Sequence, residues 1–152
     1  MLASFYRAFR AHDNGDRWPW LGGVWKVTLA PKNCDSGAPL PAPPILTLFT
    51  FHDDGTLLGS LQNYAVSATN RSASHGQWKA VNGGRRGEFV IKFTHLRYDF
   101  VSGVYFGTQE AVSQLLLSRS GKQFTASSTA RGFDVSGTEV YKTCGELAGD
   151  RI

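Results

Sequence analysis

Residues 88–117 decide the fold, and they read EFVIKFTHLRYDFVSGVYFGTQEAVSQLLL. Over residues 88–98, apolar and polar side chains alternate and aromatic and β-branched residues are frequent, which is typical of a strand with one buried face. Ser102 and Gly103 are typical of a tight turn, and residues 104–117 again have strand character. The segment therefore predicts two long antiparallel strands joined by a hairpin.

Similar strand-like runs lie on both sides of this hairpin, with turn signals between them. We expect strands at 24–30, 45–52, 56–62, 75–81, 124–133 and 137–143. Glycine is abundant, at 17 of 152 residues, and the segments 53–55 (DDG) and 82–84 (NGG) favour hairpin turns. Eight strands joined mainly by hairpins predict an all-β fold. We expect a single eight-stranded antiparallel up-and-down barrel, because closure removes the free sheet edges.

The two ends of the chain differ from this pattern. Leu2, Phe5, Tyr6 and Phe9 recur at helical spacing, which predicts a short N-terminal helix that ends at the polar segment 13–16 (DNGD). We expect this helix to cover one end of the barrel rather than to anchor the protein to a membrane. The expected organisation is an N-terminal extension at 1–21, a barrel domain at 22–144 and a C-terminal tail at 145–152.

Charge and motifs exclude several classes of function. Sixteen Lys and Arg residues against twelve Asp and Glu residues give a net charge of +4, but the cations are mostly spread singly, so we expect no nucleic-acid partner. No apolar run approaches the roughly 18 residues of a membrane span. There is no phosphate-binding loop, dinucleotide fingerprint or G-x-S-x-G motif. The four histidines lack metal-ligand spacing, so we expect neither a metal nor a cofactor.

The candidate site follows from the alternation in residues 88–98, which puts Phe89, Phe93, His95 and then Arg97 on one face. If that face is inward, His95 can orient a ligand or act as an acid or base. The alternative is a hydrogen-bonded histidine at the barrel rim. For residues 104–117, alternation alone does not decide which side chains face inward. A buried Glu110 would require a cation such as Arg97, and an exposed Glu110 would not.

The chain has more aromatic residues than a small barrel needs in order to close, and some of them are candidates for lining an apolar pocket with a few polar groups. The candidate ligand-binding residues are Trp25, Tyr64, His75, Trp78, Phe89, Phe93, Arg97 and Phe124, with His95 as a further polar anchor.

The two cysteines, Cys34 and Cys144, are either free thiols or a disulfide. A disulfide would close a loop of roughly a hundred residues and would imply an oxidising compartment. Residues 1–11 do not read as a secretory signal because two arginines interrupt them. The compartment and the oligomeric state therefore stay open.

Gly23-Val24-Trp25 resembles the G-x-W signature that opens the first barrel strand of lipocalins and the wider calycin superfamily. In that family an arginine near the end of the chain packs on the tryptophan, and Arg151 is the candidate here. A closer resemblance is to small bacterial lipocalin-like proteins of unassigned function. It rests on Arg71-Ser72, on His75-Gly76-x-Trp78, on Gly107-Thr108-Gln109 and on a cysteine near each end of the barrel. This resemblance implies a Cys34–Cys144 pair and a secreted or periplasmic protein, but no activity.

Three hypotheses follow for the function. The first is a protein that binds a small hydrophobic or aromatic molecule inside a calycin-like barrel. The second is a cofactor-independent isomerase or cyclase that acts on an apolar substrate in the same barrel, with His95 or Glu110 as the proton-transfer group. The third is a structural role, which a lumen packed shut by phenylalanines would favour.

Overall fold

A computed structural model describes residues 19–61, 69–99 and 101–152 of the chain. The described residues form strands and one short 3₁₀ turn, η2 (Val81–Gly84). In chain order the strands are β1 (Gly23–Lys32), β2 (Ile45–Phe51), β3 (Thr56–Leu61), β4 (Thr69–Arg71), β5 (Ser74–Ala80), β6 (Glu88–Asp99), β7 (Tyr105–Leu117), β8 (Gln123–Phe133) and β9 (Glu139–Arg151).

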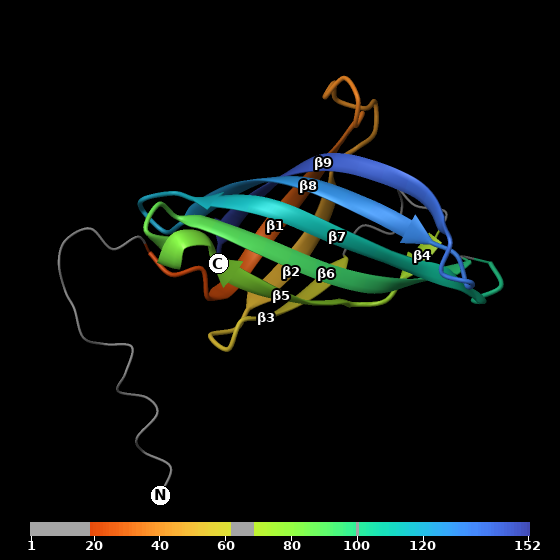
Figure 1. Cartoon of the computed structure of the whole chain (residues 1–152), viewed down its shortest axis with the longest axis horizontal. Coiled ribbons are helices and arrows are strands. Elements are labelled where there is room, and N and C mark those ends of the chain that lie inside the picture. The colour runs from red at the N-terminus through yellow and green to blue at the C-terminus, as the bar shows by residue number, and fades with distance from the viewer. Residues whose placement is uncertain (1–18, 62–68, 100) are drawn as a thin grey trace, which may run out of the picture.

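These strands close into one antiparallel barrel, as Figure 1 shows. Apart from the short strand β4, each strand pairs with the strands before and after it, and β9 returns to pair with β1 from Trp25↔Arg151 to Lys32↔Cys144. Both β4 and β5 pair with β6, so together they form one interrupted strand. At the interruption, Ser72 donates its backbone N–H to Leu96 O at 3.1 Å and accepts the Leu96 N–H on its hydroxyl at 2.9 Å. The expected eight-stranded up-and-down barrel is therefore confirmed.

The sequence predicted a helix at the N-terminus and a tail at the C-terminus, and the two predictions have different outcomes. The predicted N-terminal helix falls within residues 1–18, which lie outside the described residues. The tail expected at 145–152 is corrected, because β9 continues to Arg151 and its buried positions alternate through Leu147 and Gly149. The physical reason is closure: the backbone groups of β1 need a partner strand along their whole length.

One end of the barrel is filled by aromatic side chains. Trp25, Phe51 and Phe124 are almost fully buried, with ring centroids 5.0 Å apart for Trp25–Phe124 and 6.3 Å apart for Phe51–Phe124. Trp78 continues the cluster, 6.2 Å from Phe51 and 5.6 Å from Phe89. Gly149 leaves the room for Phe124, since a Cβ there would lie 2.2 Å from the phenylalanine ring. This end, called the packed end below, is the main hydrophobic core.

Arg151 holds the packed end together from the last strand. Its guanidinium lies 4.3 Å from the centroid of the Trp25 ring and donates hydrogen bonds to the carbonyl oxygens of Gly121 (2.7 Å), Trp20 (2.6 Å) and Gly22. The Trp25 indole in turn donates to Leu21 O at 2.9 Å. The expected packing of Arg151 on Trp25 is confirmed.

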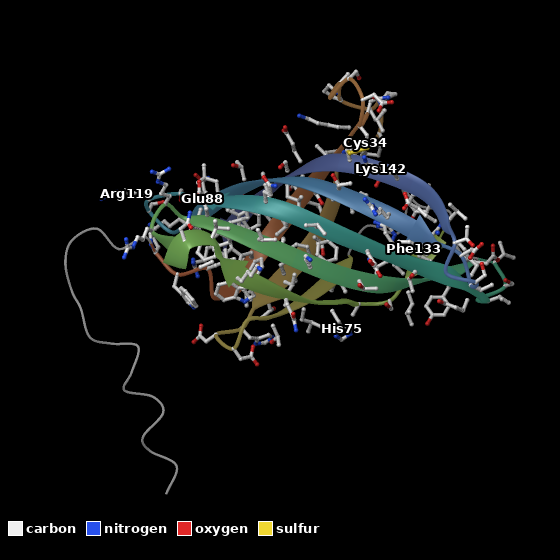
Figure 2. The ribbon with its side chains drawn as sticks, viewed as in Figure 1. Cys34, His75, Glu88, Arg119, Phe133 and Lys142 are labelled. Atoms are coloured by element: carbon white, nitrogen blue, oxygen red, sulfur yellow. A yellow bond between two sulfur atoms is a disulfide. The ribbon has the colours of Figure 1, made fainter. Side chains whose placement is uncertain are left out.

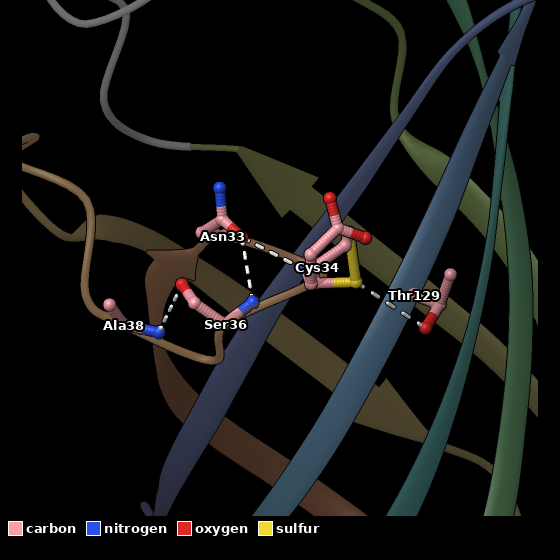
Figure 3. The surroundings of a disulfide bond; sticks show 7 residues. Asn33, Cys34, Ser36, Ala38 and Thr129 are labelled. Atoms are coloured by element: carbon pink, nitrogen blue, oxygen red, sulfur yellow. Dashed lines mark hydrogen bonds between the residues drawn. A yellow bond between two sulfur atoms is a disulfide. The ribbon is translucent and has the colours of Figure 1, made fainter.

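Cys34 and Cys144 form a disulfide, with their Cα atoms 5.1 Å apart (Figure 3). It ties the chain just after β1 to the middle of β9. Asn33 shapes the adjoining turn, since its Oδ1 accepts the backbone N–H groups of Asp35 and Ser36, each at 2.9 Å. The pairing that the resemblance implied is therefore confirmed.

Candidate functional site

The half of the barrel away from the packed end contains a partly open cavity of about 370 Å³. This volume lies within the usual range for small-molecule sites. Its apolar lining comes from Leu29, Pro31, Leu40, Ile45, Phe49, Phe93, Ala111, Ala130 and Leu147. Its polar lining includes Arg71, Ser72, Ser74, His95, Arg97, Gln109, Ser128, Tyr141 and Thr143.

Strand β6 carries three side chains that line the cavity one after another. Phe93, His95 and Arg97 are two residues apart, so they share the inward face, and all three line the cavity. Arg97 is nearest the β6–β7 turn and Phe93 is nearest the packed end. At about 3.3 Å per residue, Phe93 and Arg97 are separated by about 13 Å along the strand. The lining therefore changes from aromatic to cationic toward one end of the cavity.

The orientation of β7, which the sequence left open, is decided by its burial. Gln109 and Ala111 face the cavity, and Ser113 is fully buried and donates a hydrogen bond to Ser128 on β8 at 2.9 Å. Glu110 is exposed and therefore points outward. Small inward side chains on β7 and β8 leave the space that the cavity occupies.

Arg97 contacts two aromatic rings. Its guanidinium carbon lies 4.4 Å from the ring centroid of Phe106 and 4.6 Å from that of Tyr141. Tyr141 is itself fixed, because its hydroxyl donates to Gln109 Oε1 at 2.6 Å. Gly132 permits this position of the ring, since a Cβ there would lie 2.0 Å from Tyr141. The arginine is thus positioned by stacking and by a chain of contacts across β7, β8 and β9.

A second arginine lies beside the first. Arg71 on β4 is the direct cross-strand partner of Arg97 on β6, and both line the cavity. Burial lowers the pKa of Arg71, Tyr141 acts in the opposite direction, and the charge of Arg97 acts in the same direction as burial. Among the described residues, the buried Nε of Arg71 has no hydrogen-bond partner. Two like charges in facing positions normally destabilise a strand pair.

His95 is neutral at physiological pH. Burial is the main cause that lowers its pKa to about 4, and the charges of Arg71 and Arg97 add to the effect. Gln109 acts in the opposite direction through a hydrogen bond. The residue is only 4% exposed, and its Nε2 has no hydrogen-bond partner in the part of the chain that the structure describes.

The residues that the sequence suggested for the site lie in different parts of the barrel: at the cavity, at the packed end and on the outer face. Phe93, His95 and Arg97 come together at the cavity. Trp25, Trp78, Phe89 and Phe124 belong to the packed end. His75 and Glu110 are exposed on the outer face, and Figure 2 shows His75 projecting away from the barrel. Tyr64 lies outside the described residues.

Sequence reasoning missed several polar residues of the cavity, and three of them matter most for the site: Arg71, Gln109 and Tyr141. Two of them lie in the motifs quoted for the resemblance, Arg71-Ser72 and Gly107-Thr108-Gln109, and those motifs were the available signal. The sequence around Tyr141 offered no such signal, because its role depends on a side-chain hydrogen bond from β9 to Gln109 on β7.

Within the described ranges, no group of three or more His, Cys, Asp and Glu side chains is arranged to hold a metal ion. The same residues contain no helix long and apolar enough to cross a membrane. The chain matches no model of a known protein family, and it has no significant match among curated proteins. The site is therefore defined by its own geometry, as the cavity of a closed antiparallel barrel.

Proposed function

We propose that this protein is a lipocalin-like barrel that binds a small hydrophobic or aromatic molecule in its cavity. The observation that carries the proposal is the contrast within one barrel. One end is filled by interlocking aromatic rings, whereas the other contains a partly open cavity of about 370 Å³ beside stacked and buried polar side chains.

A purely structural barrel would gain from filling this space, because cavities in a core lower stability. Several inward residues at the cavity are instead small or polar, with Ala111 and Ala130 among the small ones. His95 and Arg71 also keep buried nitrogen atoms without partners. Such unsatisfied groups are uncommon in folded proteins, and a ligand would satisfy them.

The test uses native mass spectrometry of the purified protein together with titration of N-phenyl-1-naphthylamine, a neutral fluorescent aromatic probe. We expect a bound small molecule or saturable probe binding. Ala130→Phe, which fills the cavity, abolishes probe binding, whereas Thr125→Phe, on the outer face of the same strand, leaves it unchanged. No adduct and no probe binding would contradict the proposal and favour a structural role.

A cofactor-independent isomerase or cyclase is the second candidate, and His95 is the observation in its favour. It is a buried neutral imidazole with an unpartnered nitrogen at the cavity, which is suited to proton transfer. Its pKa of about 4 makes it a weak base, however, and Glu110 is exposed on the opposite face of β7. These two facts favour binding over catalysis.

His95→Gln distinguishes the two candidates once a ligand is known. If the protein is an enzyme, the variant loses turnover and retains affinity. If the protein only binds, no turnover of the ligand is found with either the wild type or the variant.

The disulfide supports an oxidising setting, either secreted or periplasmic, because such bonds are rare where thiols are kept reduced. The check is the mass of the denatured protein taken from its native host. A gain of two hydrogens on treatment with reductant supports this setting, and no gain contradicts it.

A further inference from the structure

We propose that the molecule bound in the cavity is an organic acid, with an apolar body against Phe49 and Phe93 and a carboxylate held by Arg71 and Arg97. This inference rests on the proposed binding function and names the class of its ligand. It assigns an anion-binding role to a pair of arginines on two neighbouring strands.

The first argument is the placement of the two charges. Arg71 and Arg97 are direct cross-strand partners and line the same cavity, so their positive charges repel each other. Among the described residues that line the cavity there is no carboxylate to offset this repulsion. The ion pairs recorded in the described ranges, Lys32–Glu146 and Arg131–Glu139, do not involve either arginine. A bound anion would supply the missing charge.

The second argument is the free donor capacity of the site. The Arg97 guanidinium lies close to the rings of Phe106 and Tyr141. Within the described residues no hydrogen bond or ion pair engages its N–H groups, so they remain available to a ligand. The buried Nε of Arg71 also lacks a partner within residues 19–61, 69–99 and 101–152. Guanidinium N–H groups match the two oxygens of a carboxylate, and the resulting charge-assisted hydrogen bonds are among the strong ones in proteins.

The third argument is the polarity gradient along β6, which orients the ligand. Phe93 packs against Phe49 with ring centroids 5.4 Å apart, and the apolar lining continues with Leu147. Arg97 lies four residues further along the same strand. His95, between them, has an unpartnered buried nitrogen that can meet a polar atom of the ligand. An inorganic anion would use the arginines and leave the apolar part of the cavity unfilled.

The test compares two fluorescent probes that share one aromatic scaffold. 1-Anilinonaphthalene-8-sulfonate carries an anionic group, whereas N-phenyl-1-naphthylamine lacks it. We expect the wild type to bind the anionic probe more tightly by about tenfold or more, which is the effect of one strong charge-assisted interaction. Octanoate should displace either probe at concentrations at which 1-octanol does not.

Arginine variants locate the effect. Arg71→Gln and Arg97→Gln should each weaken binding of the anionic probe by about tenfold or more and leave binding of the neutral probe within about twofold. Arg97→Met keeps part of the packing against Phe106 and Tyr141 and serves as a second variant if Arg97→Gln does not fold. Arg86→Gln, an exposed arginine in the β5–β6 connection, is the matched control and should bind both probes as the wild type does.

The outcomes separate this inference from the function on which it rests. If both probes bind equally well and the arginine variants bind like the wild type, the barrel is a binding protein but its ligand is not an organic acid held by the two arginines. If neither probe nor octanoate binds to the folded wild type, both the proposed binding function and the inferred organic-acid ligand are overturned. Preference for the anionic probe that is lost in Arg71→Gln and Arg97→Gln supports the inference.

Discussion

The two ends of this barrel are built on the same strands but are filled in opposite ways. On β6, the inward residue at the packed end is Phe89, whereas at the cavity end it is Arg97. On β8 the corresponding change is from Phe124 to Ala130. Inward and outward side chains alternate along most of β6 and β8, with register shifts only at Arg97/Tyr98 and Gly132/Phe133 near the cavity end. The comparison therefore teaches that backbone closure makes the barrel, while the volume and polarity of the inward side chains decide whether an end is core or site.

The polar groups show the same division. At the packed end, the charged side chain of Arg151 is covered by hydrogen bonds to three carbonyl oxygens and by the Trp25 ring. At the cavity end, Arg71 and His95 each retain an unpartnered buried nitrogen. A satisfied arginine stabilises the fold, whereas an unsatisfied one is available to a ligand.

The largest expected effect concerns the disulfide, which fastens the loop beside the cavity to β9. Replacing both cysteines (Cys34→Ser with Cys144→Ser) should lower the free energy of unfolding by about 4.7 kcal/mol, because a loop of this length loses its constraint in the unfolded chain. Equilibrium denaturation with urea measures the change. A loss below about 1 kcal/mol would mean that the unfolded state is already compact.

The next prediction compares one phenylalanine from each end. Phe124→Ala should lower the free energy of unfolding by about 4 kcal/mol, because it empties a closely packed space between Trp25 and Phe51. Phe93→Ala should cost about 2 kcal/mol, because one side of its ring already faces the cavity and has fewer contacts to lose. Urea denaturation of both variants provides the measurement. Equal losses would contradict the division into core and site.

The third prediction concerns the pH dependence of stability. The pKa of His95 is about 4 in the folded protein and about 6.5 in the unfolded chain, so only the unfolded state takes up this proton between those values. Stability should therefore fall as the pH drops from 6.5 to 4, by about 3 kcal/mol from this one group. His95→Gln should remove this component in urea denaturation at a series of pH values.

His75→Gln, which replaces an exposed histidine on β5, controls for the loss of a histidine as such. The expectation fails if the wild type and His95→Gln lose stability in parallel as the pH falls.

The smallest effect has the opposite sign. Arg71→Gln should raise the free energy of unfolding by about 0.5 kcal/mol in the absence of ligand, because it removes the repulsion between facing arginines. Thermal unfolding of the ligand-free protein measures the change, with Arg86→Gln as the control. A clear loss of stability would instead assign Arg71 to the scaffold and would weaken the contrast between the two ends.

Much of the fold was predictable because it depends on local patterns. Alternation over residues 88–117 and the turn signals around the other runs predicted an antiparallel eight-stranded barrel. The extent of β9 was not predicted, because residues 145–151 carry few apolar side chains and two glycines. Their strand conformation is imposed by pairing with β1, which is a long-range interaction.

For the site, the sequence by itself determined that Phe93, His95 and Arg97 share one face of a strand, since that follows from the period of two. Only the tertiary structure decided that this face is inward, that Arg71 is opposite Arg97, and that Tyr141 reaches Gln109. It also decided that Trp25, Trp78, Phe89 and Phe124 are core and that Glu110 faces outward. The physical reason is that alternation fixes which side chains lie together on a strand, whereas closure of the sheet fixes which of them meet across the lumen.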